Sequence, residues 1–481
     1  MIINAEYDKK IQKWLEKNRQ TVIEKWMDLI RIPSVRGEAA PDAPFGAECA
    51  RAVAKANEYY AQAGFETRHY PDRGYALASY GEGEKTVGLF AHCDVVPVGD
   101  GWMYTQPFEP KIIEGTMVGR GTSDDKAGVM ASWAVLSMLK ECDIPIQGKI
   151  LAFSGSNEES GMGDITAFVK HERIPELSLS PDGTFPCSVG EKGILRMWTE
   201  CQTPMVAIED FRGGDAFNVV LDKAEVVLSA NEALEKELKA LLQDNTAVTM
   251  TLEETGKICL KAQGAARHAG NPKGGVNATL LAAQVLEQCR TLPETDRKAM
   301  ATLSKFLGDF DGEGMGIAVV DPDFGPLTSA NGMVDVEDGK LRVSLDIRYG
   351  VVVDHEEIEK DLARIWEAEG WKIVYMFNRK GFNAPKDSPV PEIVVGVCKE
   401  VAGKDLKPFR MAGGTYCRYL PNAFPVGVAI SGEDGVVAKL TFPAGHGGAH
   451  QRDESLLIDN FFRGIRILAH TVIACDEALH K

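Results

Sequence analysis

The sequence predicts an α/β fold whose main domain is interrupted by an inserted α+β domain. Over residues 86–154, apolar segments of strand length alternate with helical segments, which is typical of a sheet with helices on its faces. The same alternation returns near Pro385, whereas amphipathic strands and helices lie between. The 481 residues are also too many for one ordinary core. We therefore expect a first domain over 1–191 and 385–481, and an inserted domain over 192–384.

Apolar periodicity places the individual elements. Apolar residues recur at roughly helical spacing between Ile11 and Ile30, which predicts an amphipathic N-terminal helix. Further elements of the first domain are expected as strands at 86–91, 149–154 and 424–430 and as helices at 126–140, 391–401 and 455–474. Those of the insert are expected as strands at 224–229 and 247–252, a helix at 231–242, a helix beginning near 277 and a hairpin at 333–348.

Composition narrows the class of partner. The net charge of −17 argues against binding to nucleic acid or anionic membranes, because such surfaces need clustered Lys and Arg. The ten cysteines show no regular spacing, which indicates thiols in a reducing compartment rather than a disulfide framework. Neither a signal-peptide core nor a spanning segment is recognisable. We expect a cytoplasmic protein that acts on a small molecule.

Polar residues at the ends of the expected strands suggest a metal site. His92 and Asp94 lie two residues apart, so on a strand their side chains point the same way, and one can ligate while the other holds the imidazole from behind. Asp124 and Asp125 lie where a glycine-rich loop enters a helix. From that position a carboxylate can bridge two ions.

Four further residues extend this set. Glu158 and Glu159 are consecutive, so one is expected to ligate and the other to act as a base. Asp182 is expected in a turn after Pro181, and His450 precedes the last helix. Taken singly, these residues have ordinary interpretations: a solvated pair, a turn carboxylate or a polar contact. Their joint occurrence at successive strand ends favours a metal site.

Charge counting favours two divalent ions. Their four positive charges are balanced by three carboxylates and a bridging hydroxide, and two histidine ligands favour zinc, although manganese and cobalt also suit this set. The carboxylates counted are those of Asp124, Glu159 and Asp182.

Several motifs resemble those of the co-catalytic zinc peptidase superfamily of aminoacylase, glutamate carboxypeptidase and succinyl-diaminopimelate desuccinylase. The chain is most similar to its bacterial dipeptidase V, or carnosinase-like (Xaa-His dipeptidase), branch. The strings that carry the resemblance are A-H-C-D-V-V-P (91–97), G-R-G-T-S-D-D-K (119–126), N-E-E-S-G (157–161), S-P-D-G (180–183), A-F-N (216–218), R-H-A-G-N-P-K-G-G-V-N-A (267–278), D-I-R-Y (346–349), G-G-T-Y (413–416) and H-Q-R-D-E (450–454).

The resemblance implies a zinc-peptidase-like mixed-sheet catalytic domain with the insert as a lid, and it implies roles for single residues. The implied metal ligands are His92, Asp124 as the bridge, Glu159, Asp182 and His450. Glu158 is the implied general base and Asp94 the carboxylate behind His92. The peptide after the bridging Asp is usually cis in that family.

The resemblance also implies substrate contacts on the insert. His268 would stabilise an oxyanion, whereas a loop-capping histidine is the alternative. Arg348 and Asn218, both expected on lid strands, would hold a substrate carboxylate with Gly414 and Thr415. An internal ion pair between Arg348 and Asp346 is the alternative. The long insert favours a monomer.

These observations lead to one main functional hypothesis. We expect a dipeptidase for unblocked dipeptides, in which a metal-bridging hydroxide attacks the amide and Glu158 relays its proton. An amidohydrolase of N-acyl amino acids and a catalytically silent binding protein are the alternatives. Cys93, between His92 and Asp94, is either a reactive thiol beside the site or a small buried hydrophobe.

Overall fold

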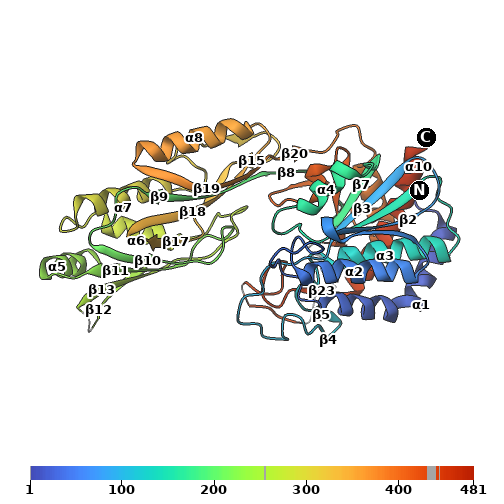
Figure 1. The fold of residues 1–481 in the computed structure, drawn as a ribbon, viewed down its shortest axis with the longest axis horizontal. Helices are drawn as coiled ribbons and strands as arrows, with labels where there is room; N and C mark the ends of the chain where they lie inside the picture. The colour runs from blue at the N-terminus through green and yellow to red at the C-terminus, as the bar shows by residue number, and fades with distance from the viewer. Residues whose placement is uncertain (1, 254–255, 431–439, 444) are drawn as a thin grey trace. The chain divides into compact units, whose positions relative to one another are not determined.

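The computed structural model describes residues 2–253, 256–430, 440–443 and 445–481, and its chain forms two compact units (Figure 1). Unit 1 comprises Met1–Gly190, Ala384–Phe409 and Thr415–Lys481, and unit 2 comprises Glu191–Asn383 and Arg410–Gly414. Residues 410–414, expected in the first domain, group with unit 2. There the Met411 carbonyl accepts a hydrogen bond from the Lys192 N–H at 3.0 Å, which ties the segment to the insert.

A six-stranded mixed sheet forms the centre of unit 1, which confirms the predicted α/β fold. Its strand order is β1-β2-β6-β3-β7-β22, and its last four strands run parallel. The strands are β1 (Glu66–Tyr70), β2 (Tyr75–Tyr80), β6 (Lys149–Gly155), β3 (Thr86–His92), β7 (Leu177–Phe185) and β22 (Ala423–Ile430). The strands expected at 86–91, 149–154 and 424–430 are confirmed as β3, β6 and β22.

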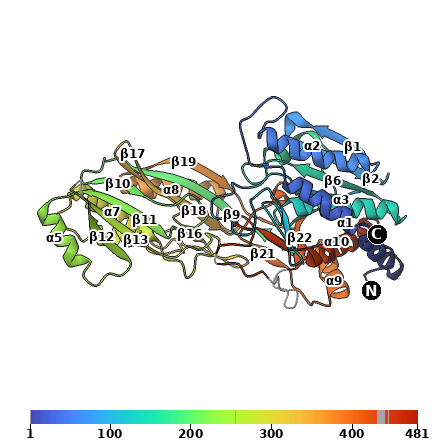
Figure 2. The same cartoon turned by 90° about the horizontal axis from the view of Figure 1, so that it is seen from below.

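Helices cover this sheet. Helices α2, α3 and α10 pack on its strands, α1 packs on α3, and α9 lies beside α10 (Figure 2). The helices of unit 1 are α1 (Ala5–Ile30), α2 (Ala47–Gln62), α3 (Lys126–Glu141), α4 (Gly163–His171), α9 (Val390–Ala402) and α10 (Ile458–Leu479), with 3-10 turns η1 (Pro71–Arg73) and η2 (Tyr416–Tyr419). Most of α3 is buried because it lies between the sheet and α1.

One expected helix begins later than its apolar pattern suggested. Residues 455–457 form strand β23 (Ser455–Leu457), because they pair antiparallel with β5 (Thr116–Val118), which in turn pairs with β4 (Lys111–Ile113). Helix α10 starts only at Ile458. This small sheet therefore joins the segment before Asp124 to the segment after His450.

Unit 2 contains two larger antiparallel sheets. The first has the order β10-β11-β13-β12 and the second the order β16-β18-β9-β19, with β17 also paired to β18. Their strands are β10 (Ile208–Arg212), β11 (Lys223–Ser229), β13 (Lys257–Gln263), β12 (Val248–Leu252), β16 (Thr328–Ala330), β18 (Lys340–Tyr349), β9 (Gly193–Cys201), β19 (Trp371–Arg379) and β17 (Val334–Glu337). Strands β14 (Val320–Asp321) and β15 (Gly325–Pro326) form a separate two-stranded sheet.

Helices α6 and α8 pack on these two sheets, α6 on β11 and β13 and α8 on β19 (Figure 1). The helices are α5 (Glu232–Leu241), α6 (Ala278–Leu286), α7 (Glu294–Phe306) and α8 (His355–Ala368), and the short strands β8 (Ser188–Glu191), β20 (Phe382–Asn383) and β21 (Phe409–Met411) lie near the unit boundaries. A continuous apolar core, including Trp366 and Trp371, lies under the sheets. Within the described ranges, no helix has the length and apolar character needed to cross a membrane.

Candidate metal centre

The parallel strands of unit 1 bring the predicted ligands together at one edge. His92 is the last residue of β3, and Glu158 and Glu159 follow the end of β6 in a turn. Asp182 does not lie in a turn as expected, because β7 continues to Phe185. Pro181 is tolerated inside this strand, since pairing with β3 ends at Leu179 and no ladder N–H is needed on that side.

The His92 ring is oriented by the strand that carries it. Its Nδ1 lies 3.0 Å from the Asp94 backbone carbonyl, which can only accept a hydrogen bond, and 3.5 Å from the Asp94 carboxylate. Nδ1 therefore carries a proton, and the Nε2 lone pair faces the site. Nε2 lies 3.1 Å from Asp124 Oδ1 and 3.7 Å from Asp182 Oδ2.

The Asp94 carboxylate links two strand ends. It accepts hydrogen bonds from the backbone N–H groups of Glu158 and Glu159, both at 3.1 Å. This contact holds the glutamate turn after β6 against the end of β3. Asp94 therefore orients the Glu158 and Glu159 backbone as well as the His92 ring.

The Asp124 carboxylate is shared by two histidines. Oδ1 faces His92 Nε2, and Oδ2 lies 2.9 Å from His450 Nε2. The same His450 nitrogen lies 3.0 Å from Glu159 Oε2. The Asp124–Asp125 peptide is cis, as the family resemblance implies. A carboxylate whose two oxygens point to two different imidazoles has the arrangement of a bridging ligand.

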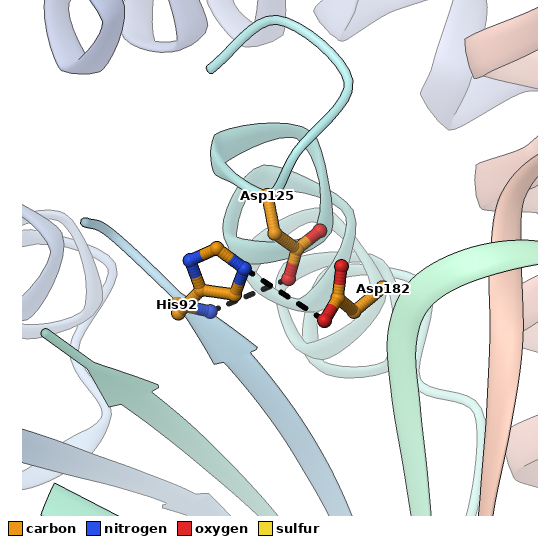
Figure 3. Close-up of side chains that lie close together, drawn as sticks. All are labelled: His92, Asp125 and Asp182. Carbon is orange, nitrogen blue, oxygen red and sulfur yellow. Dashed lines mark hydrogen bonds and ion pairs between the residues drawn. The ribbon is translucent and has the colours of Figure 1, made fainter. Parts of the chain in front are cut away.

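Asp125 also lies close to this set and was not among the predicted ligands. Its Oδ1 accepts a hydrogen bond from the Gly128 N–H at 3.1 Å, which caps α3, and its Oδ2 accepts one from the His92 N–H at 3.3 Å. Figure 3 shows the carboxylates of Asp125 and Asp182 pointing toward His92. Three potential ligand atoms of His92, Asp125 and Asp182 lie within 4.8 Å of one another. Its two backbone hydrogen bonds make Asp125 a helix cap that also supports β3.

Burial and crowding of carboxylates shift the pKa values of this cluster. Burial, with nearby carboxylates, raises the pKa of Glu158 well above its usual value and that of Asp182 to about 7. Burial opposes protonation of His92, yet the carboxylates of Asp182 and Asp124 raise the pKa of its imidazole well above the usual value. The cluster therefore attracts positive charge, either as protons or as cations.

The donor set suits divalent metals. It offers two imidazole nitrogens and three carboxylates, a mixture that binds zinc, manganese and cobalt. Oε1 of Glu158 and Oε1 of Glu159 are buried and have no hydrogen-bond partner in the part of the chain that the structure describes. Buried carboxylate oxygens without a donor are costly, so a cation at this place would relieve them.

Sequence reasoning missed two supporting carboxylates. Asp164, at the start of α4, accepts hydrogen bonds from the Ser156 and Asn157 N–H groups at 2.6 and 2.8 Å and from the Tyr416 hydroxyl at 2.5 Å. Glu454 is the second, and it holds the loop that leads to Asp124. Glu454 and Tyr416 stand inside the quoted strings H-Q-R-D-E and G-G-T-Y, which was the available signal.

In unit 2 the structure brings His268 and Asn218 together. The Ala269 N–H donates to the Asn218 carbonyl at 2.9 Å, and Val219 forms a β-bridge with His268. Asn218 lies in a turn before this bridge, and not on a strand as expected, because β10 ends at Arg212. The Gly270 N–H donates to His268 Nδ1 at 3.0 Å, which places the proton of a neutral ring on Nε2.

Arg348 lies on β18, as expected, and pairs with Asp346 through Nε and Nη2. The internal ion pair named as the alternative is thus present. Asp346 also accepts a hydrogen bond from Arg196 at 3.1 Å, and Arg348 Nη1 donates to the Ala412 carbonyl at 2.9 Å. Two guanidinium groups share one carboxylate here, which leaves one excess positive charge.

The last two predicted substrate contacts belong to different units. Gly414 ends the segment of unit 2 that follows Ala412. Thr415 belongs to unit 1, where it is buried and its hydroxyl accepts a hydrogen bond from the Cys417 N–H at 3.2 Å, capping η2.

Cys93 is also fully buried, and burial raises the pKa of its thiol to about 12, which favours the unreactive alternative.

Comparison with known proteins identifies the family. The sequence model of peptidase family M20/M25/M40 matches residues 88–474. The chain belongs to this family. The predicted class, a metal-dependent hydrolase of peptide bonds, is confirmed at family level.

The similarity to relatives and to a solved structure extends along nearly the whole chain. A Bacillus subtilis protein named "Putative dipeptidase YtjP" is 28% identical over 95% of this chain and 97% of its own length. A Staphylococcus aureus protein named "Putative dipeptidase MW1694" is 26% identical over 96% and 100%. Human carnosine dipeptidase 1 shares the fold with a TM-score of 0.62 at 16% identity, covering 98% of this chain and 99% of its own. The M20 peptidase fold is therefore shown for both units.

Proposed function

We propose that this chain is a metal-dependent dipeptidase that hydrolyses unblocked dipeptides. The observation that carries the proposal is the Asp124 carboxylate, which faces His92 with one oxygen and His450 with the other. The names of the most similar relatives support the choice of dipeptides over other amides. The match extends over almost the full length of those relatives, so it includes the insert as well as the metal centre.

The proposed cofactors are two divalent ions, zinc above manganese or cobalt. His92, Asp124 and Asp182 would hold one ion, and His450, Asp124 and Glu159 the other. When bound, the ions would polarise the scissile carbonyl and lower the pKa of a water molecule. This leaves the protein to position the substrate and to move protons.

Glu158 is the proposed general base. Its carboxylate is buried and its turn is held by Asp94, so its position is set by two strand ends. It would accept a proton from the attacking water and return it to the leaving amine. The burial that raises its pKa suits a group that must both take up and release a proton.

Unit 2 would contribute groups for the substrate's ends. The neutral His268 ring carries its proton on Nε2, which suits donation to an oxyanion. The excess positive charge shared by Arg348, Arg196 and Asp346 suits a free carboxylate. The remaining proposed contacts are Asn218 and Gly414 of unit 2 and Thr415 of unit 1. We also propose that the enzyme acts as a monomer.

A substrate panel on metal-reconstituted protein tests the proposal. The metal-free protein is loaded with zinc, manganese or cobalt, its metal content is measured, and hydrolysis of Ala-Ala, Ala-Ala-Ala, Ala-Ala amide and N-acetyl-Ala is compared. We expect two ions per chain and clear preference for Ala-Ala. Preference for N-acetyl-Ala would establish the acylase alternative, and no hydrolysis by the two-metal protein would favour a binding protein.

A further inference from the structure

A carboxylate outside the proposed ligand set holds the loop that carries Asp124. Glu454 is fully buried (0% exposed) and lies four residues after His450. Its Oε1 accepts hydrogen bonds from the backbone N–H groups of Ser123 at 2.7 Å and Asp124 at 3.0 Å, and from the Ser123 hydroxyl at 3.0 Å. One oxygen thus fixes the backbone on which the bridging side chain is mounted.

The second oxygen of Glu454 extends this contact along the same loop. Oε2 accepts hydrogen bonds from the Gly121 N–H at 3.0 Å and from Arg120 Nη1 at 2.8 Å. Arg120 is as buried as its partner, at 1% exposed, so the two opposite charges compensate one another inside the protein. Arg120 Nη2 also approaches the His450 carbonyl at 3.4 Å. The loop and the His450 segment are therefore tied by both partners of the ion pair.

The backbone continues this connection beyond Glu454. The Gly119 N–H donates to the Glu454 carbonyl at 2.9 Å, and Ser455 pairs with Val118 in the β5–β23 ladder. Two chain segments thus run together up to Glu454 and then separate, one toward Asp124 and the other back toward His450. Glu454 joins the two segments where they separate, beside the contact that Arg120 makes with the His450 carbonyl.

We propose that Glu454 is a positioning residue that sets the spacing between Asp124 and His450. This inference rests on the proposed two-metal function and deepens it. Glu454 would affect the ion that Asp124, Glu159 and His450 are proposed to hold. Residues that orient ligands typically contribute about 10- to 100-fold to metal affinity.

The substitution Glu454→Gln tests this role with little change in shape. One carboxylate oxygen becomes an NH₂ group, which cannot accept a hydrogen bond. Whichever way the amide is turned, one of the two sets of N–H donors loses its acceptor. The matched control is Asp453→Asn, because Asp453 is equally buried but accepts hydrogen bonds from the Met103 and Tyr104 N–H groups, both at 2.9 Å.

The measurement is titration of metal-free protein with Co²⁺, followed by calorimetry and by visible absorption. We expect wild type and Asp453→Asn to bind two equivalents, and Glu454→Gln to bind one equivalent about tenfold or more weakly with an altered spectrum. Two equivalents of unchanged affinity and spectrum in Glu454→Gln would overturn the inference, as would an equal loss in Asp453→Asn. Failure of the wild type to bind two ions would instead refute the proposed function.

A double variant tests whether Glu454 positions the loop or only compensates the charge of Arg120. It also replaces the single variant if that variant does not fold. Arg120→Met/Glu454→Gln removes both buried charges, so it avoids an unpaired guanidinium. We expect it to recover thermal stability relative to Glu454→Gln but to keep the weakened metal equivalent. Full recovery of both metal affinities in the double variant would show that Glu454 serves only to neutralise Arg120, and would contradict a positioning role.

Discussion

The candidate metal centre of unit 1 and the candidate substrate groups of unit 2 are built in different ways. In unit 1, His92 ends β3 and Glu159 follows the end of β6. The buried carboxylates of Asp94 and Glu454 hold the backbone of the Glu159 turn and of the Asp124 loop. In unit 2, His268 lies exposed on a loop and Asn218 in a turn, whereas Arg348 is buried and already paired. We therefore propose a preformed reaction centre in unit 1 and, in unit 2, a recognition region with fewer fixed contacts.

The largest expected effect is loss of the bridge. Asp124→Ala removes a carboxylate that faces both histidines, so we expect loss of both metal equivalents and of peptide hydrolysis. Elemental analysis after dialysis, with a dipeptide assay, measures both. Asp453→Asn is the control, because one Asp453 oxygen accepts both the Met103 and Tyr104 N–H groups and an amide oxygen can replace it. We expect it to retain two ions, and two ions in Asp124→Ala would contradict the bridging role.

The next effect concerns proton transfer without metal loss. Glu158→Gln keeps the turn and its contacts with Asp94, so we expect two bound ions but turnover lower by about 10²- to 10⁴-fold, the usual contribution of a general base. Steady-state kinetics on the metal-loaded variant measure this. Near-normal turnover would remove Glu158 as the base, and loss of an ion would indicate that it ligates.

The same contrast between the units explains what could be predicted from the sequence. Regular strands obey simple periodicity, so His92 and the glutamate turn could be placed at one sheet edge in advance. The turn assigned to Asp182 was wrong, because Pro181 stands where β7 no longer pairs with β3. Glu454 stands inside the quoted string H-Q-R-D-E, but its role was missed because its partners lie more than three hundred residues earlier in the chain.

Arg348 shows a different limit. Asp346 and Arg348 are two apart on β18, so their side chains share one face, and the internal ion pair follows from that spacing. Arg196 comes from the neighbouring strand β9, opposite Asp346 in the register, which local sequence does not reveal. The excess charge of this group became visible only in the folded chain.

A smaller effect is expected in the recognition region. Arg348→Ala should lower kcat/KM for Ala-Ala, because a substrate carboxylate would be left unpaired. The loss should correspond to about 2–4 kcal/mol of transition-state free energy. The effect on Ala-Ala amide should be much smaller. Arg212→Ala, which removes an exposed arginine of the same unit, is the control. Equal losses on the dipeptide and its amide would show that Arg348 acts only through its ion pair with Asp346.

The smallest effect is expected beside the metal centre itself. Cys93 is fully buried between His92 and Asp94, and burial raises the pKa of its thiol to about 12, so the reactive thiolate is scarce at neutral pH. Cys93→Val should therefore leave activity and sensitivity to thiol reagents unchanged and alter stability by less than about 1.5 kcal/mol. Cys142→Ser is the control, because Cys142 is partly exposed and should account for the labelling of native protein. Mass-spectrometric mapping of labelled cysteines, paired with the dipeptide assay, decides the point. Inactivation that disappears in Cys93→Val would mean that the centre opens to solvent, and it would weaken the contrast between a preformed centre and a looser recognition region.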